Sequence, residues 1–590
     1  MTFNAIKALF EQGKYQAVVD QLVQWTADGV FDTFTEQEQI ECVYYQNYAL
    51  HELGNAKEAL QNVLAARQKY TTPTDRSLLL VLITQQIYAL CQMNRLDEAR
   101  EVISEGDTIL ESLTVKERET GLYWIAFFEQ RKGGYYWVKK DFDTTLEYWH
   151  RALALREKIG DLYALGHSLG NLGTCYRFKG EYDTALDYYQ RSLDLNKQMG
   201  NTQSIAWAFT QIGFTYRAKG ELDTALIYYQ QALSIYEEIG SPNWIAFSLG
   251  IIVHAHINKG ELDTALEYNR RCLRLSREVY QKTESAYNLA SCFETFVRIY
   301  YLKGELDTAL DYVQQALTFQ GTVGEPYFLF DAIFLSALIY QAQGELDTAF
   351  ERLQQCLSEM EQSGNDIWIS LGLFHLVRVV LAQQNHPQAQ KYLNRLQQLQ
   401  NRTPNPWIHL YSRLAEALVL KQSRRLKEKI RAQTILEQLV QEKVLSFYLT
   451  ALAMVHLSEL LIAEVKLYGE PDVWEEVKAL IDKLYVMAQD QHSFSMSVEA
   501  LLLRAKFAAV DGNLSQALKY YEQAQFTATE KNLPVLLAKV DTEQTRFKTE
   551  FAKWQDKSLQ ETIVIMEIDD YIKEVIDKFN LDIPREPREP

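Results

Sequence analysis

Hydrophobic and small residues recur at helical spacing on both sides of one repeated turn. The string Lys-Gly-Glu-(Leu/Tyr)-Asp-Thr-Ala-Leu occurs at 179–186, 219–226, 259–266 and 303–310, with variants at 140–146 and 343–350. A Tyr or His stands four residues before each turn glycine, and an Ala stands five residues after it. Both flanks therefore have the period of an α-helix, and the pattern predicts a series of helix–turn–helix units.

Two glycines punctuate each unit. The turn glycines follow one another at intervals of 40, 40, 44 and 40 residues: Gly180, Gly220, Gly260, Gly304 and Gly344. A second series lies 20 residues later and reads as helix C-caps: Gly160, Gly200, Gly240, Gly324 and Gly364. Glycine adopts positive φ without a steric cost, so the second series predicts left-handed backbone at helix ends, and the first series marks tight turns.

Weaker copies of the turn extend the array in both directions. They include Gly13-Lys14-Tyr15 and Asn94-Arg95-Leu96 toward the N-terminus, and Asn385-His386-Pro387 and Gly512-Asn513-Leu514 toward the C-terminus. We predict divergent repeats at 1–123, a regular array of 40-residue repeats at 124–400 and divergent helical repeats at 401–580. Residues 581–590 are rich in Pro, Arg and Glu and are expected to form a disordered tail.

Two of the helix–turn–helix units carry a motif that resembles that of a known repeat family. Leu172-Gly173-x-x-Tyr176 and Ile212-Gly213-x-x-Tyr216 resemble helix A of the tetratricopeptide repeat, although Val or Ala replaces the helix-A glycine in later units. The long unit is similar to those of kinesin light chains, spindle-orientation adaptors and bacterial sensor arrays. The resemblance implies an all-α fold, a right-handed superhelical α-solenoid of antiparallel helix pairs.

In that family the A helices line the concave side, and subtracting the packing positions leaves a candidate groove. Its residues are His167, Asn171, Thr174, Arg177, Trp207, Gln211, Phe214, Arg217, Phe247, His254, Asn258, Glu294, Arg298 and Tyr301. Amide and Arg side chains can bind a peptide's backbone and carboxylates, and aromatic rings supply anchor area. The blander interpretation is that these side chains are solvated or make intramolecular contacts.

We therefore expect a scaffold or adaptor that binds a peptide or helix of a partner protein. The alternative is a regulatory sensor whose superhelix responds to a small ligand or signalling peptide. A third possibility is an enzyme with a site in the divergent C-terminal region, where His456, His492 and Glu499 are the best candidates. Homo-oligomers are also possible, because repeat arrays without polar end caps tend to stack.

The sequence lacks the common motifs of catalytic sites. The sequence contains no phosphate-binding glycine loop and no paired zinc ligands, so we expect no enzyme activity, no metal and no cofactor. Gly166-His167-Ser168-Leu169-Gly170 fits the pattern of a nucleophile elbow, but it falls inside a predicted helix instead of after a strand. The six cysteines form no CxxC pair and are expected to pack in the core.

Charge and hydropathy restrict the classes of binding partner and the cellular compartment that we expect. The 590 residues carry a formal net charge of −18, which disfavours general binding to nucleic acids or anionic membranes. No stretch was expected to reach the roughly 18 apolar residues of a membrane-spanning helix. The simplest expectation is a cytoplasmic protein, and the two basic stretches, around 270–277 and 421–431, are expected to be solvated helix faces.

Overall fold

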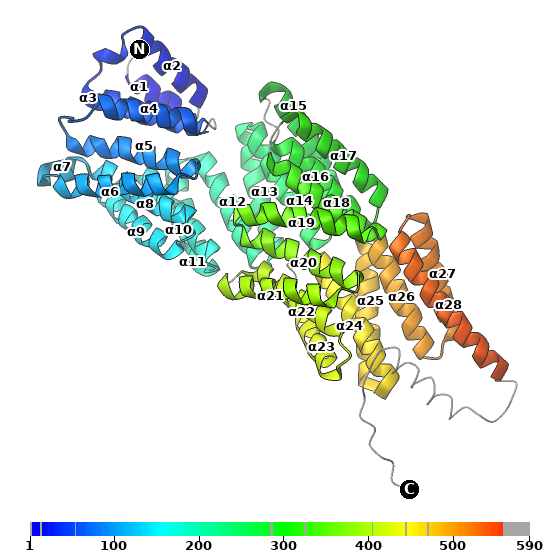
Figure 1. Ribbon diagram of the computed structural model, residues 1–590. Helices are drawn as coiled ribbons and strands as arrows, with labels where there is room; N and C mark the ends of the chain where they lie inside the picture. Colours follow the sequence, from blue (N-terminus) through cyan, green and yellow to red (C-terminus); the bar gives the residue numbers. More distant parts are fainter. Residues whose placement is uncertain are drawn as a thin grey trace. The chain divides into compact units, whose positions relative to one another are not determined.

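The computed structural model describes residues 3–11, 14–52, 55–283, 287–323, 326–403, 405–442, 445–468 and 471–557. Within these ranges the chain forms 28 α-helices and two short 3-10 helices, and it contains no strand (Figure 1). The predicted all-α class is therefore confirmed. The predicted tail at 581–590 lies outside the described residues.

The chain divides into two compact units, Met1–Thr215 and Tyr216–Pro590. The division falls inside one helix, α12 (Thr202–Ala218), which belongs to the predicted regular array. Each unit is a tandem series of helices and is described here by itself. The limits predicted from the sequence at 123, 400 and 580 stay predictions.

Unit 1 runs from α1 to the first part of α12, coloured blue to cyan in Figure 1. Its helices are α1 (Phe3–Glu11), α2 (Tyr15–Ala27), α3 (Glu36–Glu52), α4 (Ala56–Lys69), α5 (Leu79–Gln92), α6 (Leu96–Ser112), α7 (Val115–Thr120), α8 (Leu122–Val138), α9 (Phe142–Ile159), α10 (Leu162–Phe178) and α11 (Tyr182–Met199). The two 3-10 helices are Phe31–Thr33 and Arg76–Leu78.

Unit 2 continues the series from the end of α12. Its helices are α13 (Leu222–Ile239), α14 (Pro242–Lys259), α15 (Leu262–Thr283), α16 (Tyr287–Lys303), α17 (Leu306–Val323), α18 (Pro326–Gln343), α19 (Leu346–Ser363), α20 (Asp366–Ala382), α21 (His386–Arg402), α22 (Pro406–Lys421), α23 (Leu426–Gln441), α24 (Phe447–Tyr468), α25 (Pro471–Asp490), α26 (Phe494–Val510), α27 (Leu514–Glu530) and α28 (Pro534–Lys557). Even-numbered helices from α8 onward are the A helices, and the odd-numbered ones are the B helices.

Left-handed backbone occurs at both series of glycines, as predicted for the second series. The turn glycines have φ of 82°, 76°, 85°, 83° and 87° at Gly180, Gly220, Gly260, Gly304 and Gly344. Gly160, Gly200, Gly240 and Gly364 cap the B helices with φ between 61° and 76°, and Gly324 lies outside the described residues. Asn94, Lys140 and Gln384 adopt the same conformation without a glycine, which identifies them as the turns of the weaker copies.

The repeated aromatic before each turn stacks on an aromatic of the following B helix. The ring pairs Tyr136–Tyr148, Tyr176–Tyr188, Tyr216–Tyr228, His256–Tyr268 and Tyr300–Tyr312 have centroids 5.3–5.6 Å apart and interplanar angles of 7–17°. Because offset stacking of two rings is favourable beyond the area it buries, the same contact fixes each helix pair in turn. The aromatic period read from the sequence is thus a packing device.

A second recurring contact joins a helix–turn–helix repeat to the repeat before it. The lysine that opens a turn reaches back to the aspartate of the preceding turn, with Nζ–Oδ1 distances of 2.8 Å for Lys179–Asp143, Lys259–Asp223 and Lys303–Asp263. These aspartates also lie in the first turn of a B helix, where their charge is favourable. The spacing of Lys and Asp in the repeated motif therefore places one residue at a helix start and another in contact with the preceding repeat.

In unit 2 the later A helices return to the earlier ones. Helices α24, α26 and α28 contact α14, α16 and α18 in that order. A Cβ atom added at Gly260 would lie 2.6 Å from the Phe447 ring, at Gly304 3.1 Å from the Ser495 backbone nitrogen, and at Gly344 3.1 Å from Val535. Unit 2 therefore closes on itself through its own turns.

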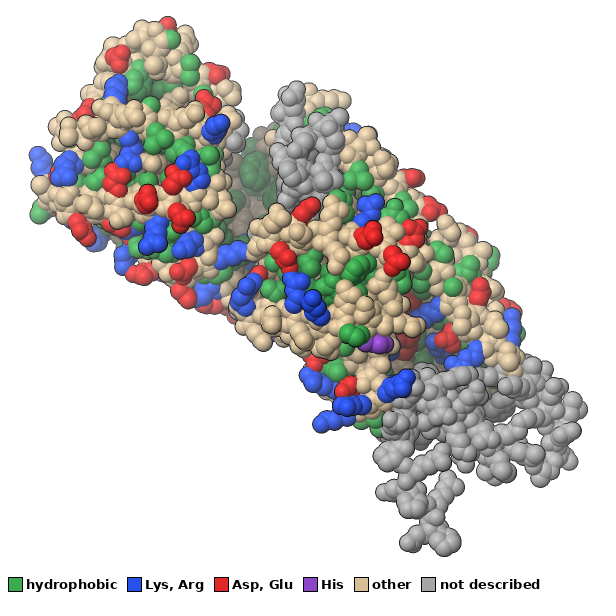
Figure 2. All heavy atoms as spheres, in the orientation of Figure 1, with side chains coloured by type: hydrophobic (Ala, Val, Ile, Leu, Met, Phe, Trp, Pro, Cys, Tyr) green, Lys and Arg blue, Asp and Glu red, His purple; other side chains and the backbone are tan. Residues whose placement is uncertain are grey.

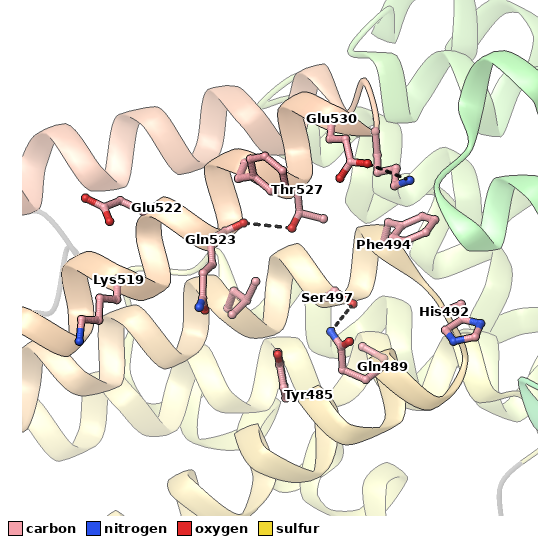
Figure 3. A pocket seen from close by; sticks show the side chains of 14 residues that line it. Tyr485, Gln489, His492, Phe494, Ser497, Lys519, Glu522, Gln523, Thr527 and Glu530 are labelled. Carbon is pink, nitrogen blue, oxygen red and sulfur yellow. Dashed lines mark hydrogen bonds and ion pairs between the residues drawn. The ribbon is translucent and has the colours of Figure 1, made fainter.

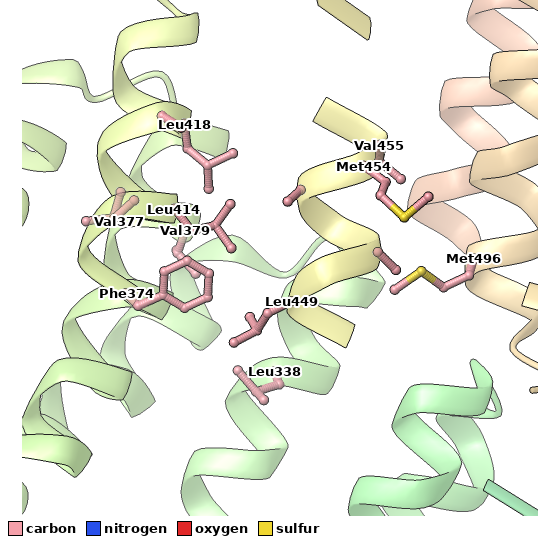
Figure 4. Close-up of a cluster of buried hydrophobic side chains, with 14 of the residues drawn as sticks. Leu338, Phe374, Val377, Val379, Leu414, Leu418, Leu449, Met454, Val455 and Met496 are labelled. Carbon is pink, nitrogen blue, oxygen red and sulfur yellow. The ribbon is translucent and has the colours of Figure 1, made fainter. Parts of the chain in front are cut away.

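Two of the closing contacts repeat at equivalent positions. Asn532 Nδ2 donates to Asp307 Oδ2 over 2.9 Å. His492 contacts Asp263, which occupies the same repeat position as Asp307 in the preceding turn. Ser493 Oγ also donates to the Leu302 carbonyl oxygen over 2.7 Å. Behind these contacts lies an apolar cluster shared by α18, α20, α22, α24 and α26 (Figure 4), whose labelled members include Leu338, Phe374, Leu414, Leu449 and Met496.

Candidate functional site

The predicted groove residues lie on the A helices α10, α12, α14 and α16. Unit 1 holds His167, Asn171, Thr174, Arg177, Trp207, Gln211 and Phe214, and unit 2 holds Arg217, Phe247, His254, Asn258, Glu294, Arg298 and Tyr301. Every one of them is at least partly accessible. The joint role of the two sets as one groove stays a prediction.

Two amides stand at equivalent positions in unit 1. Asn171 and Gln211 each lie nine residues before a turn glycine, and both are half-buried. Among the described residues neither side chain makes a hydrogen bond. A primary amide offers both donors and an acceptor, so this pair can bind the backbone of an extended peptide.

Arg177 lies near the end of α10, three residues before its turn glycine. Its guanidinium lies 4.7 Å from the Phe178 ring centroid and 5.9 Å from that of Phe214, and its buried Nε has no hydrogen-bond partner among the described residues. His167 lies nearer the start of α10, with its ring edge-on to Tyr163. Burial and the charge of Arg156 lower the pKa of His167, which favours its neutral form.

Two other members of the set take part in packing. Thr174 Oγ1 accepts from the Tyr189 hydroxyl and donates to the Gly170 carbonyl oxygen, each over 3.0 Å. Trp207 packs edge-on against Tyr189 and covers Gly170, where an added Cβ would lie 2.7 Å from the indole. Both side chains therefore already hold α10, α11 and α12 together, as the blander interpretation anticipated.

In unit 2 a neutral histidine lies among arginines. Burial, together with the charges of Arg298 and Arg217, lowers the pKa of His254 to about 3. His254 therefore stays uncharged at neutral pH. It stands six residues before Gly260, as Arg298 stands six residues before Gly304, so the two occupy the same face of successive A helices.

The remaining members of the unit 2 set are varied. Phe247 packs edge-on against Trp244, with ring centroids 5.7 Å apart. Asn258 is half-buried, and its side chain makes no hydrogen bond within the described part of the chain. Glu294 is the one carboxylate among the predicted groove residues and lies one helical turn before Arg298.

Tyr301 and Arg298 belong to a ring of aromatic and cationic side chains. The Tyr301 hydroxyl lies 3.4 Å from that of Tyr448, and both are within hydrogen-bonding reach of Arg378. The Arg378 guanidinium lies 5.8 Å from the centroid of Tyr448 and 5.9 Å from that of Phe374.

The ring continues through the next A helix. Phe374 packs against Tyr411, with centroids 5.5 Å apart, and Tyr411 lies near enough to Arg298 for that charge to lower its pKa against the larger effect of burial. We call Arg298, Tyr301, Phe374, Arg378, Tyr411 and Tyr448 the arginine–tyrosine ring. It draws on α16, α20, α22 and α24.

Sequence reasoning missed four members of this ring. Arg378 stands six residues before Gln384, the left-handed turn residue of its repeat, and so occupies the same repeat position as His254 and Arg298. Extending the groove register past Tyr301 would have found it. Phe374, Tyr411 and Tyr448 carry no such signal, because their place depends on how far the array winds.

The described part of the chain contains open pockets away from the predicted groove residues. One of about 530 Å³ lies among α25, α26 and α27 and is lined by Tyr485, Gln489, Phe494, Lys519 and Phe526 among others (Figure 3). Another, of about 540 Å³, lies between α1 and α2 beside Ala5, Leu9 and Gln24. Neither contains a predicted groove residue.

The residues considered for a catalytic site have structural partners. His456 Nδ1 lies 2.9 Å from Lys421 Nζ and 3.3 Å from Glu459 Oε2, and Lys539 joins Glu459 to Glu499. Burial and Lys421 together lower the pKa of His456 to about 4. His492 contacts Asp263 instead of this network. Among the described residues no group of three or more His, Cys, Asp or Glu side chains could hold a metal ion.

One described helix segment, Phe447–Lys466, is long and apolar enough to cross a membrane by length and composition, contrary to the expectation that no stretch would qualify. Its mean hydropathy is 1.5, and 61% of it is buried. Leu449, Met454, Val455 and Leu457 on this helix pack in the apolar core of unit 2. Core helices of soluble proteins have the same properties. On the face shown in Figure 2, acidic and basic side chains are interspersed.

Comparisons with solved structures give matches of low identity. Aspartyl phosphate phosphatase F from Bacillus subtilis is 15% identical, with a TM-score of 0.45, covering 62% of this chain and 95% of that one. A Rap protein complexed with competence and sporulation factor is 14% identical, with a TM-score of 0.45, covering 62% and 98%.

A signal transduction ATPase with a tetratricopeptide repeat sensor from Pyrococcus horikoshii is 16% identical, with a TM-score of 0.39, covering 54% of this chain and 49% of that one. No curated protein sequence matches.

Family comparisons cover more than half of the chain. The tetratricopeptide repeat model matches residues 126–198 and 204–278, and the model of the MalT-like TPR region matches residues 289–506. These ranges contain the five turn glycines from Gly180 to Gly344 and the stacked aromatic pairs described above. The chain is a member of the tetratricopeptide repeat family.

Proposed function

We propose that this protein is a non-catalytic scaffold or adaptor that binds a peptide or helix of a partner protein along its A helices. The observation that carries the proposal is the pair of equivalent amides, Asn171 and Gln211, which are accessible and make no hydrogen bond within the described residues. Arg177 and Phe214 lie on the same helices and supply a cation and an apolar ring. This combination suits an extended segment that presents backbone amides and acidic or apolar side chains.

The array itself supports this proposal. A helix pair stacks on its neighbours and leaves a continuous face of one helix set, which suits an elongated ligand. Two of the solved structures that match are complexes, a Rap protein with competence and sporulation factor and a Rap conjugation regulator with the Phr* peptide. Because fold alone does not fix function, the proposal depends on the side chains of this chain's own A helices.

The proposal is tested by selecting peptides from a random display library against the full chain. We expect a family of related peptides whose dissociation constants lie in the micromolar range or below. The double variant Arg177→Glu, Arg217→Glu should weaken binding by about tenfold or more, because charge reversal disturbs two equivalent A-helix positions. Arg274→Glu, an exposed substitution on the B helix α15, is the matched control.

A selection without enrichment would contradict the proposal. So would peptides that bind the double variant and the wild-type chain with equal affinity, because the A-helix face would then have no part in binding. If small metabolites bind where peptides do not, the regulatory sensor replaces the adaptor.

A further inference from the structure

The arginine–tyrosine ring in unit 2 carries two positive charges without a carboxylate partner in the described part of the chain. Arg298 makes no hydrogen bond and no ion pair there, and Arg378 meets only rings, hydroxyls and the Nδ1 of His375 at 3.4 Å. Both guanidinium groups are half-buried. A half-buried cation without a counter-charge loses part of its hydration and gains little in return.

Two lysines of this chain with restricted exposure are paired with carboxylates. Lys132 is buried and pairs with Glu129 and Asp107, and Lys539 pairs with Glu459 and Glu499. The chain also carries a net charge of −18, so carboxylates are abundant. Neither Arg298 nor Arg378 forms an ion pair within the described residues, although Glu294 lies one helical turn before Arg298.

The titratable groups around Arg298 and Arg378 do not neutralise the positive charge of the two guanidinium groups. His254 stays neutral at physiological pH, and burial together with the neighbouring Tyr448 raises the pKa of Tyr301. The Tyr301 hydroxyl thus retains its proton and can donate a hydrogen bond. Glu294, one turn before Arg298, and Arg217 add one charge of each sign to this face and so leave it cationic.

We propose that Arg298 and Arg378 form the anchor for an anionic group of the ligand, a carboxylate or a phosphate, with the hydroxyls of Tyr301 and Tyr448 as further donors. This inference rests on the proposed function and deepens it, because Arg298 and Tyr301 belong to the predicted groove residues of the A helices. Guanidinium groups form paired hydrogen bonds with such anions, and a partly desolvated site strengthens them. The flanking rings of Phe374, Tyr411 and Tyr448 fix the geometry of the anchor.

The first experiment measures thermal melting of the full chain with sodium citrate or sodium pyrophosphate against sodium chloride of equal ionic strength. The anchor predicts that at least one of the two anions raises the melting temperature more than chloride does. The shift should disappear in Arg298→Gln and in Arg378→Gln and persist in Arg424→Gln, an exposed arginine of unit 2. The anion with the larger effect distinguishes a carboxylate from a phosphate.

Equal shifts in all four proteins, or no shift beyond chloride, would overturn the anchor. Arg298→Gln is the decisive variant if Arg378→Gln fails to fold, since Arg298 makes no hydrogen bond in the described chain and its loss should leave the ligand-free protein folded. Arg378→Lys keeps the charge but loses the planar fork, so it should retain only part of the shift.

A second experiment separates this inference from the proposed function. Each selected peptide is compared with a version in which Asp, Glu and the C-terminal carboxylate are replaced by amides. The anchor predicts at least a tenfold loss of affinity for wild-type chain and less than a threefold loss for Arg298→Gln. Equal binding of both versions refutes the anchor but leaves peptide binding intact, whereas an anion-specific shift without any peptide binder refutes the adaptor and leaves the anchor.

Discussion

Two adjacent glycines in α8 meet different surroundings, and the difference decides what each position tolerates. A Cβ atom on Gly133 would lie 2.3 Å from Cδ1 of Trp149, whereas one on Gly134 would meet nothing within 4 Å. Trp149 is buried and donates from Nε1 to the Gln130 carbonyl oxygen over 3.1 Å, so it has little room to move. The turn glycines could be predicted from sequence alone, but this distinction could not, because it depends on the facing side chain of α9.

We predict that Gly133→Ala lowers the free energy of unfolding of unit 1 by about 1–3 kcal/mol, the usual effect of overpacking a core. Gly134→Ala should raise it by up to about 1 kcal/mol, because alanine favours a helix and no clash opposes it. Urea unfolding followed by circular dichroism compares the two midpoints. A stabilising Gly133→Ala would contradict the described contact with Trp149.

Histidine protonation gives a prediction at the same scale. The folded-state pKa of His254 is about 3, below its usual value of 6.5, so the unfolded chain binds a proton as pH falls through 6.5 and the folded chain does not. Stability from this residue is therefore present above pH 6.5 and is lost as pH falls toward 3. His456, with a pKa of about 4, acts in the same direction.

We expect the urea midpoint of unit 2 to fall between pH 7 and pH 5, before most carboxylates titrate. His254→Gln should reduce this fall, because it removes one of the protonation sites. His386→Gln, an exposed substitution at the start of α21, serves as the control. An unchanged pH dependence in His254→Gln would show that His254 is not held neutral by its surroundings.

Among the elements, the A and B helices and their turns follow from the sequence, but the return of α24, α26 and α28 to α14, α16 and α18 does not. The period of glycines and aromatics fixes each helix pair locally. The later contacts depend on the small rotation between successive pairs, which accumulates over five repeats and leaves no mark on any one motif. Arg378 could be predicted from its position relative to the turn of its repeat. Tyr411 and Tyr448 could not, because their place beside Arg378 depends on this accumulated rotation.

The closing contacts of unit 2 predict a local effect on hydrogen exchange. Ser493→Ala removes the hydrogen bond to the Leu302 carbonyl oxygen and leaves that partly buried acceptor without this donor, at a cost of roughly 1 kcal/mol. Amide exchange should accelerate at the start of α26 and around the α16–α17 turn. Ser234→Ala, an exposed serine of α13, should change neither region. Exchange unchanged by Ser493→Ala would mean that the two turns do not depend on this contact.

On the scale of the whole molecule, solenoid architecture makes stability a property of neighbouring repeats. The division within α12 places Gly133 in unit 1 and Ser493 in unit 2. We therefore expect Gly133→Ala to accelerate exchange in helices of unit 1 and Ser493→Ala to accelerate it in unit 2. A single cooperative response of both units to either substitution, followed by exchange mass spectrometry, would contradict this independence.

The central claim is that ligands bind along the A helices through side chains that packing leaves free. The most direct measurement is the dissociation constant of a selected peptide for two double variants of the full chain. Asn171→Ala with Gln211→Ala removes the paired amides of α10 and α12, and Gln190→Ala with Gln198→Ala removes two exposed amides of the B helix α11. We predict at least a tenfold weaker affinity for the first variant and less than a twofold change for the second. Unchanged binding to the A-helix variant, or a loss confined to the B-helix variant, would contradict the account.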